Sequence, residues 1–296
     1  MKKWLFRGVV GAVVLLVSYQ GLDWLSRQSG SLPPVPAPNG YEQVLALARQ
    51  LETSSITPAE MKPQQLAALD EKNRLLVEKI HQALALDSRV PLRAEPDWMT
   101  RHVMELVDLR GLSMIFALRA EGFRQMGDAR SALACDLDVL RLANTLERGG
   151  LIIDGVNAMA MQETAREDLR ADLPHLDAAS CQQAARALEE LEVRKDTPGL
   201  IVEREDLWAA KSDGLLEKIG RVIIRDLVAT QQQSFARNYL HASLNDRELL
   251  LRLAVRASEL ETGTPVTNAA TLVPKYLKAV PLDPWSQTEL TLPGGT

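Results

Sequence analysis

Residues 117–143 read ALRAEGFRQMGDARSALACDLDVLRLA, two apolar helical patterns joined by one break at Gly127-Asp128. The first pattern extends from Trp98 to Met126 and the second from Ala129 to Arg148, after which Gly149-Gly150 gives a stop signal. In both, apolar residues recur at spacings of three and four, which places them on one helix face. The inward residues are Leu109, Leu112, Phe116, Ala120 and Phe123, then Ala132, Val139, Leu140 and Ala143. The stretch therefore predicts a helical hairpin and an all-α fold.

Helical patterns continue on both sides of this hairpin, whereas strand patterns are almost absent. A loop is expected at Ser88–Pro96, which contains two prolines, and Asp177 is expected to cap a helix. The helices expected outside the hairpin cover Tyr41–Leu51, a segment that starts at the Thr57-Pro58-Ala59-Glu60 capping box or at Pro63 and reaches Ala83, Ile152–Leu169, Asp177–Val193, Leu200–Ala210, Leu215–Leu240 and Asn245–Glu261. These helices predict an irregular stack of helical hairpins.

The central hairpin resembles one tetratricopeptide repeat unit. It has a small residue at Gly122, a Gly-Asp turn, and Ala132 at a position where the two helices must approach closely. No second copy follows at an offset of about 34 residues, and a solenoid needs at least about three stacked repeats. The resemblance therefore covers this unit alone.

The chain begins with MKKWLFRGVVGAVVLLVSYQG, in which three basic residues precede an apolar run from Gly8 to Val17. The positive-inside bias predicts that this end stays in the cytoplasm and that the rest of the chain lies across a membrane. The short run is typical of a cleaved signal peptide, whereas the wider segment Trp4–Leu25 is long enough to span a bilayer. Because no small-residue cleavage site follows, a retained signal-anchor helix over residues 1–27 is favoured. A buried core helix is the third alternative.

Beyond the anchor, the chain divides by composition into three parts. Residues 28–40 form a Pro/Ser-rich linker, expected to be an extended and semi-rigid spacer. Residues 41–262 form the all-helical extracytoplasmic domain. The Pro-rich C-terminal segment, residues 263–296, is expected to pack on the domain surface as short turns, with one helical turn at Leu272–Tyr276. This organisation predicts a single-pass protein of the bacterial inner membrane with a periplasmic domain.

The charge and cysteine content exclude some classes of function. The chain has 34 Lys and Arg against 39 Asp and Glu, and three of the basic residues stand in positions 1–7, so the remainder carries a net charge of −8. An acidic remainder disfavours nucleic acid and anionic membrane surfaces as partners. The two cysteines, Cys135 and Cys181, fall on expected helices as small buried residues or, outside the cytoplasm, as a disulfide.

The C-terminal run ETGTPVTNAATLVPKYLKAVPLDPW, residues 261–285, resembles the segment that closes a group of uncharacterised, membrane-anchored helical proteins of bacteria. The shared pattern is L-x-P-x-Y-L-x-x-x-P-x-D-P, and the middle of the chain is similar to the same group, so the resemblance covers most of residues 60–285. It implies an anchored all-helical protein and contains no catalytic motif. Thr264 and Val266 depart from this closing segment, because they replace the usual bulky residue and tyrosine around Pro265. The run is also similar to the C-terminal part of type II secretion pseudopilins, although the sequence after Pro284 lacks the glycine that follows there.

Glu78-Lys79-Ile80-His81 is an E-x-x-H at helical spacing, which lets a carboxylate and an imidazole reach one metal in di-iron bundles. Such sites need a second E-x-x-H and two further glutamates. His102–Glu105 has the reverse order, and Asp172–His175 contains a proline. The sequence therefore predicts no metal or cofactor site, and His81 is expected to be an interfacial or exposed polar residue.

Glu203, Glu205 and Asp206, with Arg204 between them, could supply general acid and base groups. On a helix, however, Glu203 and Glu205 point to different sides, so a solvated helical face is predicted. Motifs for a serine nucleophile, a P-loop or a dinucleotide site are missing. The catalytic residues, if any exist, are unknown from the sequence.

Two other sets of residues could belong to a functional site. Asp136 and Asp138 are expected on the outer side of the hairpin. Trp98, Trp208 and Trp285 either line a ligand groove or pack at the edges of helices, as tryptophans often do.

Together these features predict a non-catalytic, membrane-anchored protein that binds a protein or peptide partner in the cell envelope. The alternative is an envelope enzyme that acts on cell-wall glycan or peptide with carboxylate chemistry. A second alternative, an accessory component of a secretion or pilus machine, rests on the C-terminal resemblance alone.

Overall fold

The structure is a computed structural model that describes residues 31–52, 63–212, 214 and 225–292. The expected anchor over residues 1–27 and the capping box at Thr57–Glu60 lie outside these residues. Among the described helices, none combines the length and the hydropathy needed to cross a bilayer.

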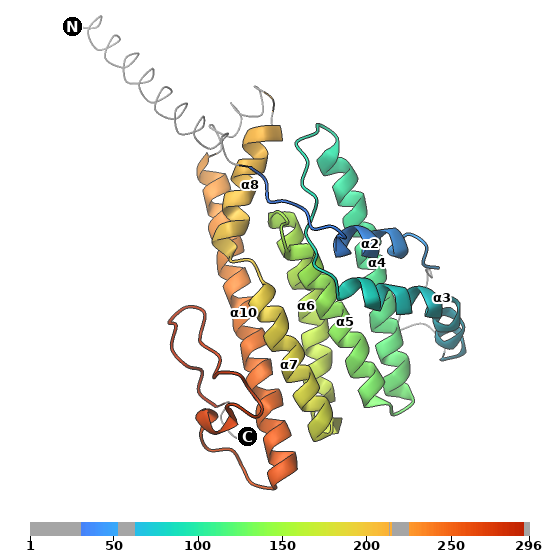
Figure 1. Cartoon of the computed structure of the whole chain (residues 1–296), viewed down its shortest axis with the longest axis vertical. Coiled ribbons are helices and arrows are strands. Elements are labelled where there is room, and N and C mark those ends of the chain that lie inside the picture. Colours follow the sequence, from blue (N-terminus) through green and yellow to red (C-terminus); the bar gives the residue numbers. More distant parts are fainter. Residues whose placement is uncertain (1–30, 53–62, 213, 215–224, 293–296) are drawn as a thin grey trace, which may run out of the picture.

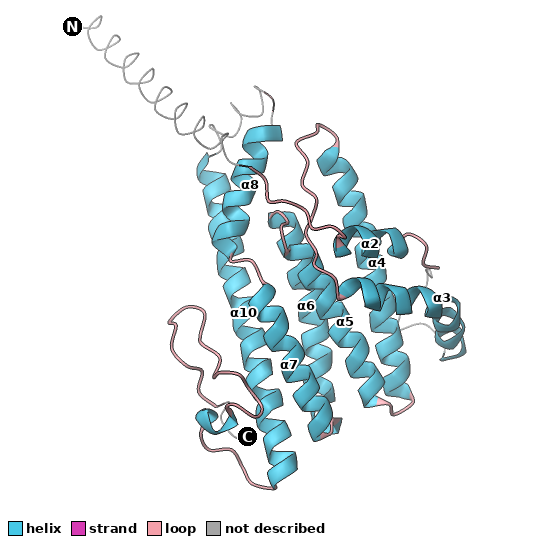
Figure 2. Cartoon of the chain, in the orientation of Figure 1, coloured by secondary structure: helices cyan, strands magenta, loops and turns pink. Residues whose placement is uncertain are grey.

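The described chain is all-α, as the sequence predicts, and Figure 2 shows helices joined by loops. Its strand-like pairing is limited to one isolated antiparallel bridge between Leu282 and Glu289. The helices are α2 (Gly40–Ala48), α3 (Pro63–Leu84), α4 (Trp98–Gln125), α5 (Ala129–Glu147), α6 (Ile152–Asp172), α7 (Ala178–Arg194), α8 (Pro198–Ser212) and α10 (Arg225–Thr262), with short 3-10 turns η2 (Leu173–His175) and η3 (Ala269–Leu272).

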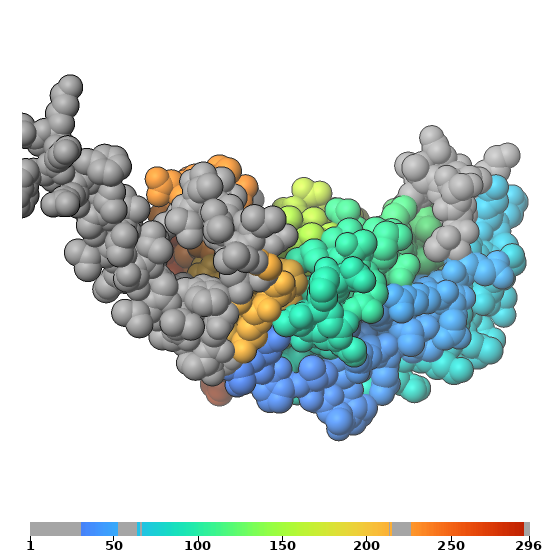
Figure 3. All heavy atoms as spheres, turned by 90° about the horizontal axis from the view of Figure 1, so that it is seen from above, coloured from blue at the N-terminus to red at the C-terminus, as the bar shows by residue number. Residues whose placement is uncertain are grey.

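Four helices form the centre of the fold. α5 packs on α6, α6 on α10, α10 on α7, and α7 on α5, which closes a four-helix ring (Figure 1). The other helices cover this ring: α4 lies along α5, α2 and α3 cross α4 and α5, and α8 lies against α6 and α10. Seen from above, the blue segment with α2 and α3 extends along one long face of the molecule (Figure 3).

The last long helix corrects the sequence prediction of two helices, Leu215–Leu240 and Asn245–Glu261. Its described part, α10, is continuous for 38 residues. The gap between the two predicted helices, residues 241–244, contains no Gly or Pro, and polar side chains within and just after it have partners inside the fold. Ser243 donates a hydrogen bond to Glu192, and Asp246 pairs with Arg166 and Lys195. The helix is therefore continuous here, with Ser243 and Asp246 on its inward side.

The α4–α5 hairpin forms where the sequence predicts it. Gly127 has a φ of +75°, a left-handed conformation that favours glycine, and Asp128 caps α5 by accepting a hydrogen bond from Ser131 N. Ala132 is fully buried against Ala120 and Cys135, so the helices do approach closely there. Gly122 is different, because a Cβ placed on it would meet nothing within 4 Å. Its small size is not required for helix packing.

The two cysteines are free thiols in separate parts of the core. Cys135 packs beside Ala120 and Ala132, whereas Cys181 belongs to the main core cluster. Burial raises the pKa of Cys135 to about 12 and that of Cys181 to about 11. Both thiols are therefore unreactive at neutral pH. Of the two interpretations from the sequence, a small buried residue or a disulfide, the structure shows the small buried residue.

The segment after α10 folds back along that helix, at the red end of Figure 1. Leu272, Tyr276 and Leu277 are buried in the main core cluster. The 3-10 turn η3 ends at Leu272, and the Tyr276 N–H donates to Leu272 O at 2.8 Å, which closes a turn over the expected residues Leu272–Tyr276. Tyr276 also donates a hydrogen bond to Glu261 at 2.6 Å, which fixes the segment to the end of α10.

The close approach in the hairpin gives a test of its packing. Ala132→Leu is expected to lower the free energy of unfolding by about 1–3 kcal/mol, because the extra methylenes have no room. Gly122→Ala is the matched control and is expected to raise it by about 0.5–1 kcal/mol, since alanine favours a helix. Urea unfolding followed by circular dichroism measures both. Equal destabilisation by the two variants would contradict this packing.

Candidate functional site

The four-helix ring encloses a set of charged side chains, here called the core ion network: Glu147 (α5), Arg166 (α6), Glu192 (α7), Lys195 and Asp246 (α10). Arg166 Nη1 lies 2.7 Å from Asp246 Oδ1, and Lys195 contacts the other oxygen of the same carboxylate. Lys195 Nζ is also 3.1 Å from Glu192 Oε2. Every helix of the ring thus contributes at least one charge.

The electrostatics of the network identify it as structural. Burial raises the pKa of Glu147 to about 7, although Lys195 opposes the shift. Burial also acts against the charge on Asp246, but Lys195 and Arg166 outweigh it and lower the pKa of that carboxyl. In di-iron bundles a metal supplies the positive charge among inward carboxylates. Here two basic side chains occupy that role.

The reversed motif His102–Glu105 lies in a second buried cluster, at the start of α4. His102 Nε2 is 2.6 Å from Asp154 Oδ1, and both side chains have no exposed surface. The other oxygen of Asp154 accepts a hydrogen bond from Leu151 N and caps α6. Burial lowers the pKa of His102, but hydrogen bonds to Asp154 and Glu105 outweigh it and raise the pKa to about 9. The pair resembles a catalytic dyad, but neither side chain is exposed to solvent.

The tryptophans do not form one groove. Trp98 stacks on His102 with ring centres 4.4 Å apart and lies 5.4 Å from Trp208. Both are buried, and their indole N–H groups donate to Pro91 O and Arg93 O, which holds the loop between α3 and α4. Trp285 lies elsewhere, edge-on to His241. The first two therefore pack at helix edges, one of the two sequence interpretations.

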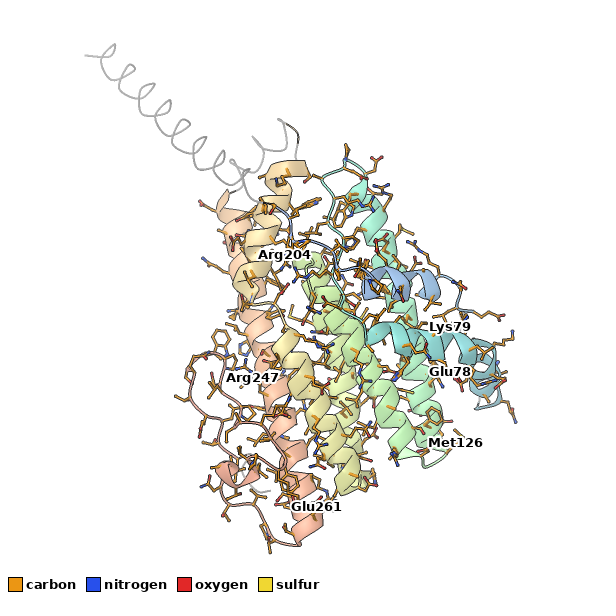
Figure 4. The ribbon with its side chains drawn as sticks, in the orientation of Figure 1. Glu78, Lys79, Met126, Arg204, Arg247 and Glu261 are labelled. Atoms are coloured by element: carbon orange, nitrogen blue, oxygen red, sulfur yellow. The ribbon has the colours of Figure 1, made fainter. Side chains whose placement is uncertain are left out.

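The acidic run on α8 does not converge on one site. Glu203 is exposed, whereas Glu205 accepts a hydrogen bond from Ile152 N at the start of α6. Asp206 accepts one from Gln232. Arg204, labelled in Figure 4, is buried and donates to Gly150 O and Asp196. These side chains hold α8 in place and leave Glu203 in solvent.

Asp136 and Asp138 correct the expectation that they lie on the outer side of the hairpin, since both are buried. α5 is surrounded by other helices, because α3, α4 and α6 all pack against it. Its sides are therefore covered, and both aspartates lie inside the fold. Arg124 contacts Asp136 at 2.5 Å and also faces Asp168 and Asp172. Burial raises the pKa of Asp136 to about 8, although Arg124 opposes it.

The two remaining histidine motifs do not assemble either. Glu78 points to solvent on α3 (Figure 4) and lies 3.5 Å from Arg74, away from His81. His81 Nδ1 instead lies 3.0 Å from Asp138. His175 is exposed, while Asp172 contacts Arg124. In the described chain, no cluster of three or more His, Cys, Asp or Glu side chains is placed to hold a metal.

A pocket of about 240 Å³ opens between α3, α5 and α7, and we call it the basic pocket. Four side chains that can carry positive charge line it: His81, Arg141, Arg148 and Arg194. Its polar floor includes the buried side chains of Asn144 and Thr145. One feature of the sequence relates to this pocket: Arg141 and Arg148 are seven residues apart, which places them on the same side of a helix. A solvated helix face has the same spacing, so the sequence alone does not identify the pocket.

The outer face of α4 is a second candidate for binding. Met104, Val107 and Met114 are 60%, 53% and 49% exposed, and Val103 lies on the same side. Gly111 lies among them, and a Cβ added to it would meet nothing within 4 Å. An apolar stripe on a helix normally faces a packing partner.

Comparisons of the chain with family models, with curated proteins and with solved structures found no match.

The His102 cluster predicts a pH-dependent stability. Because the folded pKa lies above the ordinary value, the cluster stabilises the fold fully below about pH 6.5, and this stability is lost as the pH rises through about 9. The contribution is up to about 3 kcal/mol. Urea unfolding between pH 6 and 9.5 is expected to show a flatter profile for His102→Gln than for the wild type. His175→Gln, an exposed control, is expected to keep the wild-type slope, and a steep slope in His102→Gln would refute the assignment.

The core ion network predicts a large difference between two arginines of α6. Arg166→Met is expected to cost about 3–5 kcal/mol, because it removes one of the two cations on a buried carboxylate. Arg170 also pairs with Glu163, but on the surface, and Arg170→Met is expected to cost less than about 1 kcal/mol. Urea midpoints compare the two. Similar small losses would show that the network contributes little to stability.

Proposed function

We propose that this chain is a tethered, non-catalytic binding protein of the bacterial cell envelope, and that the outer face of α4 contacts a partner protein. Residues 1–27 anchor it in the inner membrane with the N-terminus in the cytoplasm, and residues 28–40 separate the domain from the bilayer. The C-terminal and central resemblance to anchored helical proteins supports this arrangement. The exposed apolar stripe of α4 is the observation that carries the proposal.

The chemistry of the stripe defines the partner. The side chains at positions 103, 107 and 114 fall on one side of α4 at helical spacing, and methionines adapt to varied apolar surfaces. Gly111 permits close approach of another backbone. Arg110 lies in line with the stripe, is exposed, and contacts no described residue that could neutralise it. The matching partner is an amphipathic helix whose apolar face carries one carboxylate.

The buried clusters support binding over catalysis. His102 with Asp154, and Asp246 with its two cations, are the closest arrangements to catalytic groups, and both are sealed inside the fold. A general acid or base must come within hydrogen-bond reach of the substrate. Glu203 is exposed, while Glu205 and Asp206 of the same helix accept hydrogen bonds from Ile152 N and Gln232.

Photocrosslinking in intact cells tests the proposal. A photoreactive residue placed at Val107 or Met114 is expected to form an adduct with one discrete envelope protein, and the adduct site should map to an amphipathic helix. Val193, which is 84% exposed on α7, is the control position and is expected to give no such adduct. Arg110→Glu should weaken the adduct while the urea midpoint stays unchanged. The same adducts from Val193, or none from α4, would contradict the proposal.

A further inference from the structure

We propose that the basic pocket between α3, α5 and α7 binds a small ligand, or the end group of a larger one, through a carboxylate or phosphate. The pocket is built from three helices of the folded core and is distinct from the α4 face. Its residues come from segments far apart in the sequence, so it exists only in the folded domain. The inference does not depend on the proposed partner of α4.

Arg194 supplies the charge that is free to bind. It is exposed at the end of α7, lines the pocket, and makes no ion pair or hydrogen bond with any described residue. Arg148 lies across the pocket at the end of α5, with Nη1 2.6 Å from the exposed Asp87. An arginine pair of this kind can bind both oxygens of a carboxylate or phosphate.

The acidic groups around the pocket do not cancel this charge. Asp138 is shared by His81 and Arg141, at 3.0 and 2.7 Å, and its hydrogen bond raises the pKa of His81. Asp87 is taken up by Arg148, and Glu190 is the one carboxylate that lines the pocket. Three arginines therefore face three carboxylates, two of which are already paired with His81, Arg141 and Arg148, and Arg194 has no such pairing with a described residue. His81 adds positive charge to the pocket when it is protonated.

The floor of the pocket offers neutral hydrogen-bonding groups. Thr145 is 4% exposed, and its hydroxyl has no hydrogen-bond partner among the described residues. The hydroxyl is therefore available to exchange a hydrogen bond with a ligand oxygen. Asn144, beside it, gives its amide hydrogen to Glu147 of the core ion network. A polar floor under a cationic rim matches a small anion with an oxygen-rich end.

The size of the pocket limits the class of ligand. About 240 Å³ is below the usual range for drug-sized molecules. The pocket therefore accepts a single acidic group with a few attached atoms, such as the C-terminal carboxylate of a peptide or a phosphate ester. Both share the same chemistry, and the experiment separates them.

Calorimetric titration of the full-length protein, at constant ionic strength, uses sodium phosphate, N-acetylglycine and N-acetylglycine amide as probes. Phosphate, N-acetylglycine or both are expected to bind saturably, and the uncharged amide is not. Binding of phosphate alone assigns a phosphate ligand, and binding of N-acetylglycine alone assigns a carboxylate.

Matched variants locate the binding. Arg194→Glu is expected to weaken it at least 10-fold, and Thr145→Val, which keeps the shape of the side chain, to weaken it several-fold. Arg186→Glu makes the same charge change on an exposed arginine of α7 that lies outside the pocket and pairs with no described residue, and it is expected to leave affinity unchanged. Absence of saturable binding by both anions, or equal losses in Arg186→Glu and Arg194→Glu, would overturn the proposal. Urea midpoints confirm that each variant is folded.

Discussion

The contact of Asp246 with Arg166 and Lys195 is the constraint on which the rest of the fold depends. A carboxylate buried at the centre of four helices is stable only if cations accompany it, and those cations come from α6 and from the residue after α7. The lengths of the Arg166 and Lys195 side chains therefore set how α10 lies against α6 and α7. Apolar side chains could fill the same ring in several registers, whereas this pairing has one geometry.

The same constraint explains how the outer helices are placed. α5 contributes Glu147 to the centre of the ring and turns its other sides to α4 and α3. Charged residues on those sides are consequently covered as well: Asp136 meets Arg124, and Asp138 meets His81 and Arg141. Polar side chains thus connect the layers of the domain, and apolar contacts fill the space between them.

The sequence predicts the helices well because their apolar periodicity is local. The hairpin at Gly127-Asp128 and the Asp177 cap both form as expected. The features that the sequence does not predict are those that depend on partners far away in the chain. The partners that bury Ser243, Asp246 and Asp136 lie on other helices, so the local pattern predicts two helices where α10 is continuous and places Asp136 on the outer side of the hairpin. The basic pocket combines side chains from three helices, and no short spacing identifies such a combination.

The continuity of α10 also sets a distance. Its 38 residues, at about 1.5 Å per residue, span roughly 57 Å from the end beside α8 to the end that carries the C-terminal segment. The described chain enters beside α8, at one end of this rod, and the C-terminal segment begins at the other end and folds back along α10 (Figure 1). α10 is therefore a stiff rod that holds the turn at Gly263, where the C-terminal segment begins, far from the point where the described chain enters.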